Sequence, residues 1–329
     1  MSRLPITIAT WDYDRVRALA DGRVAVEGCE VNYLTMPVEE ILERAFLRSE
    51  FEVAEIGLSP YLIALSRGTA PYVAIPAFLS RMFRHSAIYI RADRGIDGPG
   101  ALRGRRVGVP EYQMSAALWV RGLLQDDYGI AAKDLDWVQG GLETPGRRDK
   151  FPLNLPEGFP LMAAGDTSLS QLLAEGKLDA VISARQPSCF VAGHPMVTRL
   201  FPDYRAAEQD YYRRTGVFPI MHAVGIRPDI LDQHPWLAAS VYKAFVAAKR
   251  LADAEFAETT ALKIGLPWVT AEFDATTALM GRDFWSYGIE PNRKTLELMV
   301  RYSYEQGLAV RRLAVEEMFA PGTLDQIRV

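Results

Sequence analysis

The sequence predicts a two-lobed α/β protein with a hinge between the lobes and a ligand cleft beside it. The chain has 329 residues, more than one compact core usually holds. Short β-rich runs alternate with helical patterns, which is typical of sheets with helical crossovers. This alternation changes near residues 92 and 215, so we expect the chain to cross between lobes twice. A cleft beside such a double crossing is a natural ligand site.

The N-terminal part of the chain alternates between strand and helix patterns. Four β-rich runs are expected to form strands: Ile6–Thr10, Phe51–Gly57, Tyr72–Ile75 and Ser86–Arg91. A helix is expected over Val38–Arg48, and Ser59 with Pro60 is expected to cap and begin another. Because helices separate the strands, we expect a parallel sheet with right-handed crossovers.

The alternation stops at a segment rich in Gly, Asp and Pro, Ala92–Gly104, and then starts again. Further strands are expected at Arg105–Pro110, Leu135–Gln139 and Asp179–Ser183. The helices expected between them, each closed by a glycine, are Ser115–Asp127 (Gly129) and Leu169–Glu175 (Gly176). Pro-rich Gly140–Gly165 shows little periodicity, so we expect a long loop there, and such loops are uncommon unless functional.

Beyond residues 218–222 the chain is mainly helical. Apolar residues three or four positions apart indicate one helix face: Leu237, Val241, Phe245, Ala248 and Ala252. Arg293–Gln306, closed by Gly307, repeats this pattern. We expect this helical tail to pack onto the first lobe. Lobe 1 would then comprise residues 1–92 and 216–329, and lobe 2 residues 93–215.

Composition and charge argue against several classes of protein. The formal net charge is −4 with no block of like charge, so no nucleic-acid partner is expected. No apolar run approaches the ~18 residues that span a bilayer, and no export signal follows Met1, so we expect a cytoplasmic protein without a membrane partner. The two cysteines are too few for a disulfide framework. The sequence contains no motif typical of phosphate-binding loops, dinucleotide-binding folds, zinc peptidases or serine hydrolases.

Arg81, Arg84 and His85 form a local cationic cluster just before an apolar strand. Guanidinium groups bind carboxylates in a bidentate manner, so this cluster suits a small organic acid. The alternative is a solvated loop in which an arginine pairs with an acidic residue. A second group of residues in the sequence also suits an anion, and this agreement favours a ligand-binding role for the cluster over a solvated loop.

That second group, Tyr112, Gln113 and Ser115, lies between an expected strand and the following helix. Free amides at a helix N-terminus favour anions, and Ser115 either contacts the ligand or only caps its helix. Arg185 follows the strand expected at Asp179–Ser183, at the carboxyl end where ligands bind in open α/β sheets. The alternative for Arg185 is an ion pair with a surface acid.

Trp11 and Tyr13 follow the first expected strand, and Glu55 and Ser59 flank the second. An aromatic wall would suit a planar ring, although a core position is the simpler interpretation of Trp11. Glu55 is either a base or a counter-charge for the arginines. A lone histidine such as His222 is more often structural, but histidine exchanges protons near neutral pH and therefore stays a candidate.

Three long motifs carry a resemblance to a known family. Phe83–Tyr89, Val109–Gly122 and Tyr211–His222 are similar to segments of the 4,5-dihydroxyphthalate decarboxylases. The resemblance extends from about Ile6 to Arg312 and departs only at Ser115, where threonine is expected. It implies the two-lobed fold of type 2 periplasmic binding proteins.

The resemblance implies the non-oxidative removal of CO2 from a dihydroxylated phthalate, which gives 3,4-dihydroxybenzoate. Each carboxylate of that substrate lies para to one hydroxyl. Deprotonating that hydroxyl pushes electron density onto the carboxylate-bearing carbon, which then accepts a proton before CO2 leaves. The protein must therefore supply a cationic clamp, a base and an acid.

The resemblance gives the candidates roles. His85 and His222 are expected to be proton donor and acceptor, in an order left open, with Glu55 as the reserve base. The expected substrate-binding residues are Arg81, Arg84, Arg185, Ser115, Tyr112, Gln113, Trp11, Tyr13 and Ser59. No cofactor is expected, because ring protonation requires none. The alternative is a divalent metal held by the two histidines and Glu55, which their spacing in the sequence does not favour.

Two other functions compete with the decarboxylase interpretation. A solute-binding protein or sensor for a small aromatic carboxylate, like the substrate-binding subunit of an ABC transporter, fits the fold equally well, but the missing export signal argues against it. An enzyme that makes a pyrimidine or menaquinone precursor is a third alternative, against which the histidine-bearing motifs argue. A homo-oligomer is suggested by the resemblance alone.

Overall fold

The computed structural model describes residues 3–147 and 149–324, which form two compact units. The first unit contains the described residues up to Arg81, Ile220–Glu297 and those from Leu313 onward. The second contains Met82–Pro219 and Leu298–Arg312. These boundaries differ from the expected ones at residues 92 and 216, because the strand Ile88–Arg91 pairs within the sheet of the second unit.

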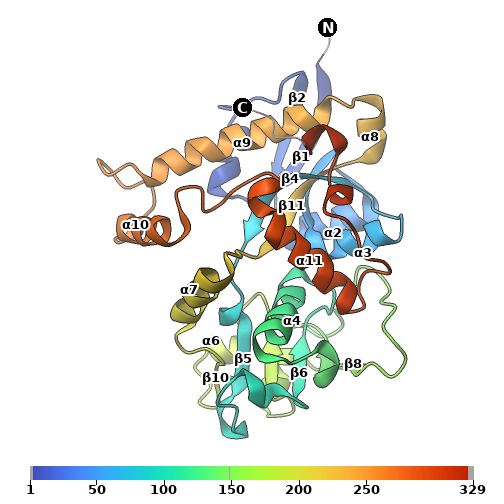
Figure 1. Ribbon diagram of the computed structural model, residues 1–329, viewed down its shortest axis with the longest axis vertical. Coiled ribbons are helices and arrows are strands. Elements are labelled where there is room, and N and C mark those ends of the chain that lie inside the picture. The colour runs from blue at the N-terminus through green and yellow to red at the C-terminus, as the bar shows by residue number, and fades with distance from the viewer. Residues whose placement is uncertain (1–2, 148, 325–329) are drawn as a thin grey trace. The chain divides into compact units, whose positions relative to one another are not determined.

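The first unit is built on a five-stranded sheet with the strand order β2-β1-β3-β11-β4. Figure 1 labels β1, β2, β4 and β11 of this sheet. Its strands are β1 Leu4–Thr10, β2 Cys29–Thr35, β3 Val53–Gly57, β4 Val73–Arg81 and β11 Ile220–Ile226. β1 runs parallel to β2 and β3, but β11 runs antiparallel to both of its neighbours. The expectation of a purely parallel sheet is therefore wrong, because a strand from late in the chain is inserted between β3 and β4.

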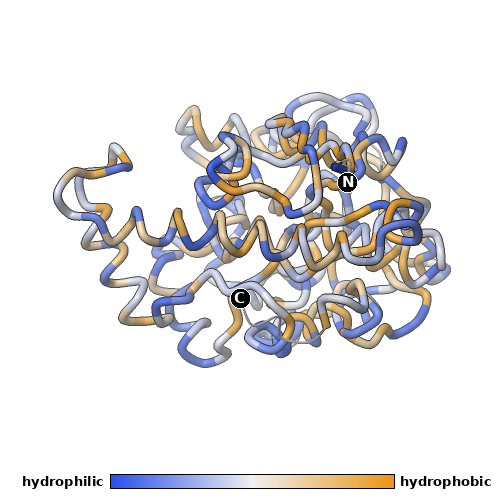
Figure 2. Tube along the Cα trace, turned by 90° about the horizontal axis from the view of Figure 1, so that it is seen from above, coloured by the Kyte–Doolittle hydropathy of each residue, from blue (hydrophilic) through white to orange (hydrophobic). Residues whose placement is uncertain are grey.

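Helices of the first unit follow the expected patterns with small shifts. They are α1 Arg17–Ala20, α2 Val38–Arg48, α3 Leu58–Ser66, α8 Pro228–Gln233, α9 Leu237–Phe256 and α10 Val269–Met280, and α11 Arg293–Glu305 starts in this unit. The apolar face predicted for α9 is confirmed, since its residues from Leu237 to Ala252 are buried. In Figure 2 the tube of α9 alternates between hydrophobic and hydrophilic colours, as expected of an amphipathic helix. Gly57 occupies the N-cap position of α3, so the prediction that Ser59 caps this helix is wrong.

The second unit contains a six-stranded mixed sheet with the order β10-β5-β9-β6-β7-β8. Its strands are β5 Ile88–Arg91, β6 Arg106–Val109, β7 Asp136–Gln139, β8 Leu161–Ala163, β9 Ala180–Ile182 and β10 Val197–Arg199. Its helices are α4 Ser115–Tyr128, α5 Leu169–Ala174, α6 Ser188–Val191 and α7 Tyr204–Thr215. The long loop predicted over Gly140–Gly165 thus contains a short edge strand.

The helix α4 ends as predicted at Gly129, whose φ of 67° is the left-handed conformation that favours glycine. Its start differs from the prediction. Met114 is the N-cap residue and Ser115 is the first helical residue, so Ser115 does not cap α4. None of the helices in the described part of the chain combines the length and the hydropathy needed to cross a bilayer.

Candidate functional site

The register of the first sheet brings Glu55 and His222 together. β11 pairs with β3 so that Val224 lies opposite Glu55 and His222 opposite Gly57. Side chains two positions apart on a strand share a face, so Glu55 and His222 are diagonal neighbours on one face of the sheet. The Nδ1 atom of His222 lies 2.6 Å from Oε1 of Glu55.

Glu55 is fully buried and accepts hydrogen bonds at both carboxylate oxygens. The phenol of Tyr13 donates to Oε1 at 2.7 Å, and the backbone N–H of Trp11 donates to Oε2 at 3.0 Å. Burial alone would raise the pKa of this carboxyl, but the hydrogen bond and charge of His222, together with the two other donors, outweigh burial and hold the pKa below its usual value. Glu55 is therefore ionised at neutral pH.

An ionised Glu55 fixes the proton arrangement of His222. Because a carboxylate only accepts hydrogen bonds, Nδ1 of His222 must carry the proton that it shares with Glu55. The Nε2 atom forms no hydrogen bond with any residue that the structure describes. The His222 side chain keeps 17% of its surface accessible, so Nε2 is the nitrogen left to exchange a proton with a bound molecule.

Arg15 belongs to the same cluster, although sequence reasoning missed it. Its guanidinium lies 4.0 Å from the ring centroid of Tyr13 and 4.1 Å from that of Trp285, and its Nε donates to the Leu79 carbonyl at 2.8 Å. Burial and the Glu55 charge raise the pKa of Tyr13, which Arg15 partly offsets. The signal available in the sequence was its position two residues after Tyr13, at the same strand end.

The remaining predicted residues of the first unit differ in exposure. Trp11 is 43% exposed, so the interpretation of Trp11 as a core residue is wrong. Its exposure beside Glu55 suits the alternative, an aromatic surface for a planar ring. Ser59 is fully buried in α3. Arg81 is buried, and its guanidinium donates to the Ser286 carbonyl at 2.6 Å and also to Asn292, so it anchors the segment after α10.

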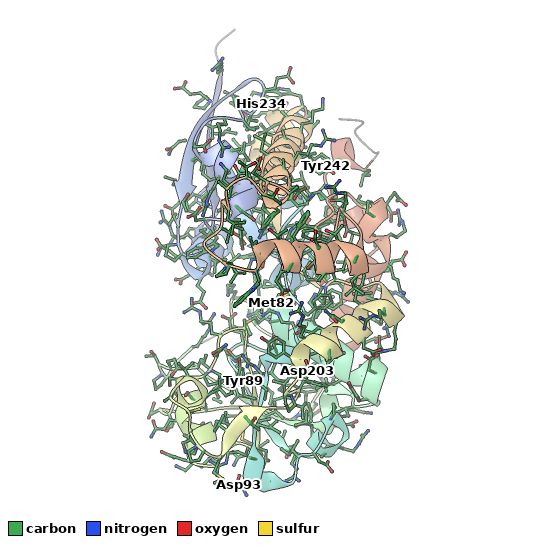
Figure 3. The ribbon with its side chains drawn as sticks, turned by 90° about the vertical axis from the view of Figure 1, so that its left-hand side faces the viewer. Met82, Tyr89, Asp93, Asp203, His234 and Tyr242 are labelled. Atoms are coloured by element: carbon green, nitrogen blue, oxygen red, sulfur yellow. The ribbon has the colours of Figure 1, made fainter. Side chains whose placement is uncertain are left out.

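In the second unit, Arg84 is a buried cation with few protein partners. Its NH1 group contacts Met82 Sδ at 3.5 Å (Met82 is labelled in Figure 3), and its Nε has no hydrogen-bond partner among the described residues. Burial lowers the pKa of Arg84 to about 10, against the influence of Glu208, which leaves it charged at neutral pH. A buried guanidinium with an unused donor suits a carboxylate ligand.

His85 lies beside Arg84 in the chain but in a different kind of environment. Its ring packs edge-on against Phe201 and Tyr211, at centroid distances of 5.1 and 5.3 Å. Burial lowers the pKa of His85 to about 4, so the imidazole is neutral near pH 7. The structure groups His85 with aromatic residues of the second unit, whereas His222 and Glu55 belong to the first. Its catalytic role stays a prediction.

The other predicted binding residues lie in the second unit. Tyr112, Gln113 and Ser115 are buried. The Tyr112 ring lies 3.8 Å from the guanidinium of Arg121, and neither its hydroxyl nor the side-chain amide of Gln113 has a hydrogen-bond partner in the described part of the chain. Arg185 is exposed. Their substrate-binding roles stay predictions.

Metal ligation was the alternative use of the histidines and Glu55. Within residues 3–147 and 149–324, no three His, Cys, Asp or Glu side chains are grouped closely enough to hold a metal ion. The polar groups that do converge are the carboxylate of Glu55, the imidazole of His222 and the phenol of Tyr13. This arrangement can hold a histidine in one tautomer and move a proton through Nε2.

Comparisons with known proteins give two decarboxylases as relatives. The chain is 43% identical over 330 aligned positions to a 4,5-dihydroxyphthalate decarboxylase of Comamonas testosteroni, covering all of both chains. It is 46% identical to a 4,5-dihydroxyphthalate decarboxylase of Pseudomonas putida over 65% of this chain and 83% of that protein. No protein-family model matches the chain.

Solved structures show the fold. The periplasmic aliphatic sulphonate binding protein SsuA from Escherichia coli superposes with a TM-score of 0.55 at 12% identity, covering 98% of this chain and 99% of that one. The alkanesulfonate-binding protein SsuA from Xanthomonas axonopodis pv. citri gives 0.53 at 12% identity, with 97% and 98% covered. The fold is therefore that of the periplasmic binding proteins, and it leaves the chemistry to the residues of the site.

Proposed function

The chain belongs to the 4,5-dihydroxyphthalate decarboxylase family and is a carboxy-lyase, and from this premise we propose that His222 and Glu55 carry its proton transfer. The reaction removes one carboxylate from 4,5-dihydroxyphthalate as CO2 and leaves 3,4-dihydroxybenzoate. The observation that carries the assignment is the buried Glu55 carboxylate, which holds Nδ1 of His222 at 2.6 Å and leaves Nε2 without a hydrogen bond to any described residue.

The chemistry explains why such a pair is needed. Direct loss of CO2 from the ring would leave an aryl carbanion that the ring cannot delocalise. Removing the proton of the hydroxyl para to the departing carboxylate lets that carbon accept a proton and become tetrahedral. The C–C bond to the carboxylate then breaks, CO2 leaves, and its bonding electrons restore the aromatic ring. One proton enters the ring for each CO2 released.

His222 is the base in this proposal. In the tautomer that Glu55 imposes, Nε2 carries a lone pair and accepts the hydroxyl proton, and Glu55 stabilises the imidazolium that forms. Tyr13 and the Trp11 amide hold Glu55 in place, since they bind its two oxygens. Well-placed general acid–base groups contribute roughly 10²–10⁴-fold to a rate.

The second unit supplies a candidate anion ligand in Arg84. Its buried charge, and an Nε that makes no hydrogen bond within the described part of the chain, support binding of a substrate carboxylate. A reaction without metal, a homo-oligomeric assembly and a cytoplasmic location are further parts of the proposal. Unpaired Cys29 and Cys189 are compatible with a reducing compartment.

The test compares His222→Ala and Glu55→Gln with the wild type, using 4,5-dihydroxyphthalate and following CO2 release and ring absorbance. We expect kcat to fall about 10²–10⁴-fold in His222→Ala, because the base is lost. Glu55→Gln keeps the shape but removes the charge that stabilises the imidazolium, so it also lowers kcat. His234→Ala, another partly exposed histidine of the first unit, is the matched control and keeps wild-type turnover.

Circular dichroism and urea unfolding establish that each variant is folded. Near-normal turnover in both His222→Ala and Glu55→Gln would remove the pair from the mechanism. If the wild type bound the substrate but released no CO2, the decarboxylase function itself would be contradicted and a binding role favoured.

A further inference from the structure

The first unit contains a cavity of about 520 Å³ between α9, α10 and the segment that follows α10. This volume is typical of sites for small molecules. The residues to which we assign proton transfer do not line it. The cavity is therefore a separate feature of the unit.

One face of α9 forms the first wall. Tyr242, Val246, Lys249 and Asp253 follow at steps of three or four residues and share a stripe on the helix (Tyr242 is labelled in Figure 3). This stripe differs from the apolar face of α9 that begins with Leu237 and is buried in the core. The two faces let α9 pack in the core and line the cavity at the same time.

Aromatic rings form the opposite wall. Phe273 of α10 stacks on Phe256 at a centroid distance of 6.1 Å with an interplanar angle of 5°. Phe284 meets Phe273 edge-on at 6.1 Å and 72°. Phe273 and Phe284 both line the cavity. Such an arrangement offers ring faces and edges to a further planar ring.

The cations that line the cavity differ in how far the described residues already pair with them. The buried Lys249 donates to Asp253 at 2.6 Å and to Asp283 at 2.8 Å, so these carboxylates already have a partner. Arg282 lines the cavity, is exposed, and forms no hydrogen bond or ion pair within the described residues. A guanidinium without a partner beside an aromatic wall suits a carboxylate attached to a ring.

Tyr287 contributes to the cavity through its ring. Tyr287 lines the cavity, and its hydroxyl is buried without a hydrogen bond to any described residue. The same burial keeps a molecule in the cavity from reaching this hydroxyl, so Tyr287 offers the cavity its ring and not its hydroxyl.

We propose that this cavity is a second, non-catalytic binding site for an aromatic monocarboxylate. The ring lies against Phe273 and Phe284, and the carboxylate pairs with Arg282. The product class of the proposed reaction has this chemistry, so that choice of ligand rests on the proposed function. The cavity itself does not depend on it.

Equilibrium dialysis with labelled 3,4-dihydroxybenzoate tests the site. Arg282→Gln removes the cation, and we expect the binding attributed to the cavity to weaken at least about tenfold, since hydrogen bonds to charged groups are worth that much. Ala254→Phe fills the cavity from α9 without changing charge and is expected to abolish that binding. Arg213→Gln, an exposed arginine of the second unit, is the matched control and binds like the wild type.

The two variants act by different means, so misfolding of one does not remove the test. Binding of the same amount of ligand with the same affinity by both folded variants and the wild type would overturn the inference. Turnover of 4,5-dihydroxyphthalate is measured in parallel. Wild-type turnover without cavity-dependent binding leaves the proposed function intact, whereas cavity-dependent binding without turnover contradicts the function and supports the site.

Discussion

His85 and His222 have the same side chain but opposite surroundings. His222 is held by an ionised carboxylate and keeps part of its surface accessible. His85 is 3% exposed and lies between two aromatic rings, where burial favours the neutral form. The same imidazole thus shares a proton with a carboxylate at one position and packs as a neutral ring at the other.

This difference predicts an acid sensitivity of folding that depends on His85. Its pKa is about 4 in the folded protein and ordinarily about 6.5, so between these pH values the unfolded chain binds a proton that the folded protein does not. Stability conferred by neutral His85 is complete above pH ~6.5 and falls as the pH decreases to ~4. The loss amounts to about 3 kcal/mol in the free energy of unfolding.

Urea unfolding of the wild type and His85→Phe over this pH range measures the effect. Phenylalanine keeps an aromatic ring in the site but cannot take up a proton, so the variant is expected to lose less stability as the pH falls. Other acidic groups, including the half-buried Glu208, titrate in both proteins and largely cancel in the comparison. Equal pH slopes for the two proteins would contradict the assignment.

Single candidate residues could be predicted from the sequence, but their partners could not. His222 and Glu55 were both identifiable as titratable groups, and Glu55 lies in a strand that the sequence predicted. Their contact depends on the register between β11 and β3, which are far apart in the chain. Arg15 was missed for the same reason, because Trp285, which stacks on it, comes from a distant segment. Side-chain chemistry is local, whereas pairing is decided by tertiary contacts.

Helices α4 and α11 contact each other through a glycine. A Cβ placed on Gly122 in α4 would lie 2.3 Å from the ring of Tyr302. The Tyr302 ring also meets Trp119 edge-on at 5.6 Å, and its hydroxyl donates to Asp126 at 2.5 Å. Gly122 is therefore required for close helix packing, although glycine weakens a helix interior.

Gly122→Ala is expected to destabilise the protein despite the better helix propensity of alanine. Propensity favours alanine by about 1 kcal/mol, whereas overpacking against a held ring costs about 1–3 kcal/mol. A distance of 2.3 Å places the cost at the upper end of this range, so the net loss is about 2 kcal/mol. Thermal or urea unfolding measures it.

Gly100→Ala serves as the comparison, because a Cβ at that position would meet nothing within 4 Å. Its effect is expected to be small. A stability gain in Gly122→Ala equal to the propensity difference would mean that the Tyr302 ring moves freely, contrary to its close packing on Gly122.

Most elements could be predicted from local patterns, but their pairing could not. The helix Val38–Arg48 and the glycine that ends α4 are confirmed, because caps and periodicity lie within a few residues. The direction of β11 between β3 and β4 carries no local signal. The strand Leu161–Ala163 was not predicted, because three residues in a Pro-rich segment are too few to show an alternation of apolar and polar side chains.

At the level of the whole chain, each unit is assembled from separate segments. The chain changes unit after Arg81, Pro219, Glu297 and Arg312, whereas two crossings were expected. The additional pair arises because α11 carries Tyr302 and Gln306, which contact α4 through Trp119 and Arg121. Periodicity identified α11 as a helix, but only its contacts decide which unit its residues belong to.

The last prediction concerns the requirements of the whole enzyme. Ring protonation needs a base, a proton donor and anion-binding groups, all of which side chains can provide. We therefore expect protein purified without chelators to contain no stoichiometric divalent metal by elemental analysis. We also expect kcat to be unchanged after dialysis against a chelator.

The catechol of the substrate itself binds metals, so assays at several substrate concentrations separate loss of free metal from loss of enzyme-bound metal. The opposite result would be one metal retained per chain, with activity lost on chelation and restored when the metal is added back. In that case His222 would not be the sole proton acceptor, and a metal would assist deprotonation of the substrate hydroxyl.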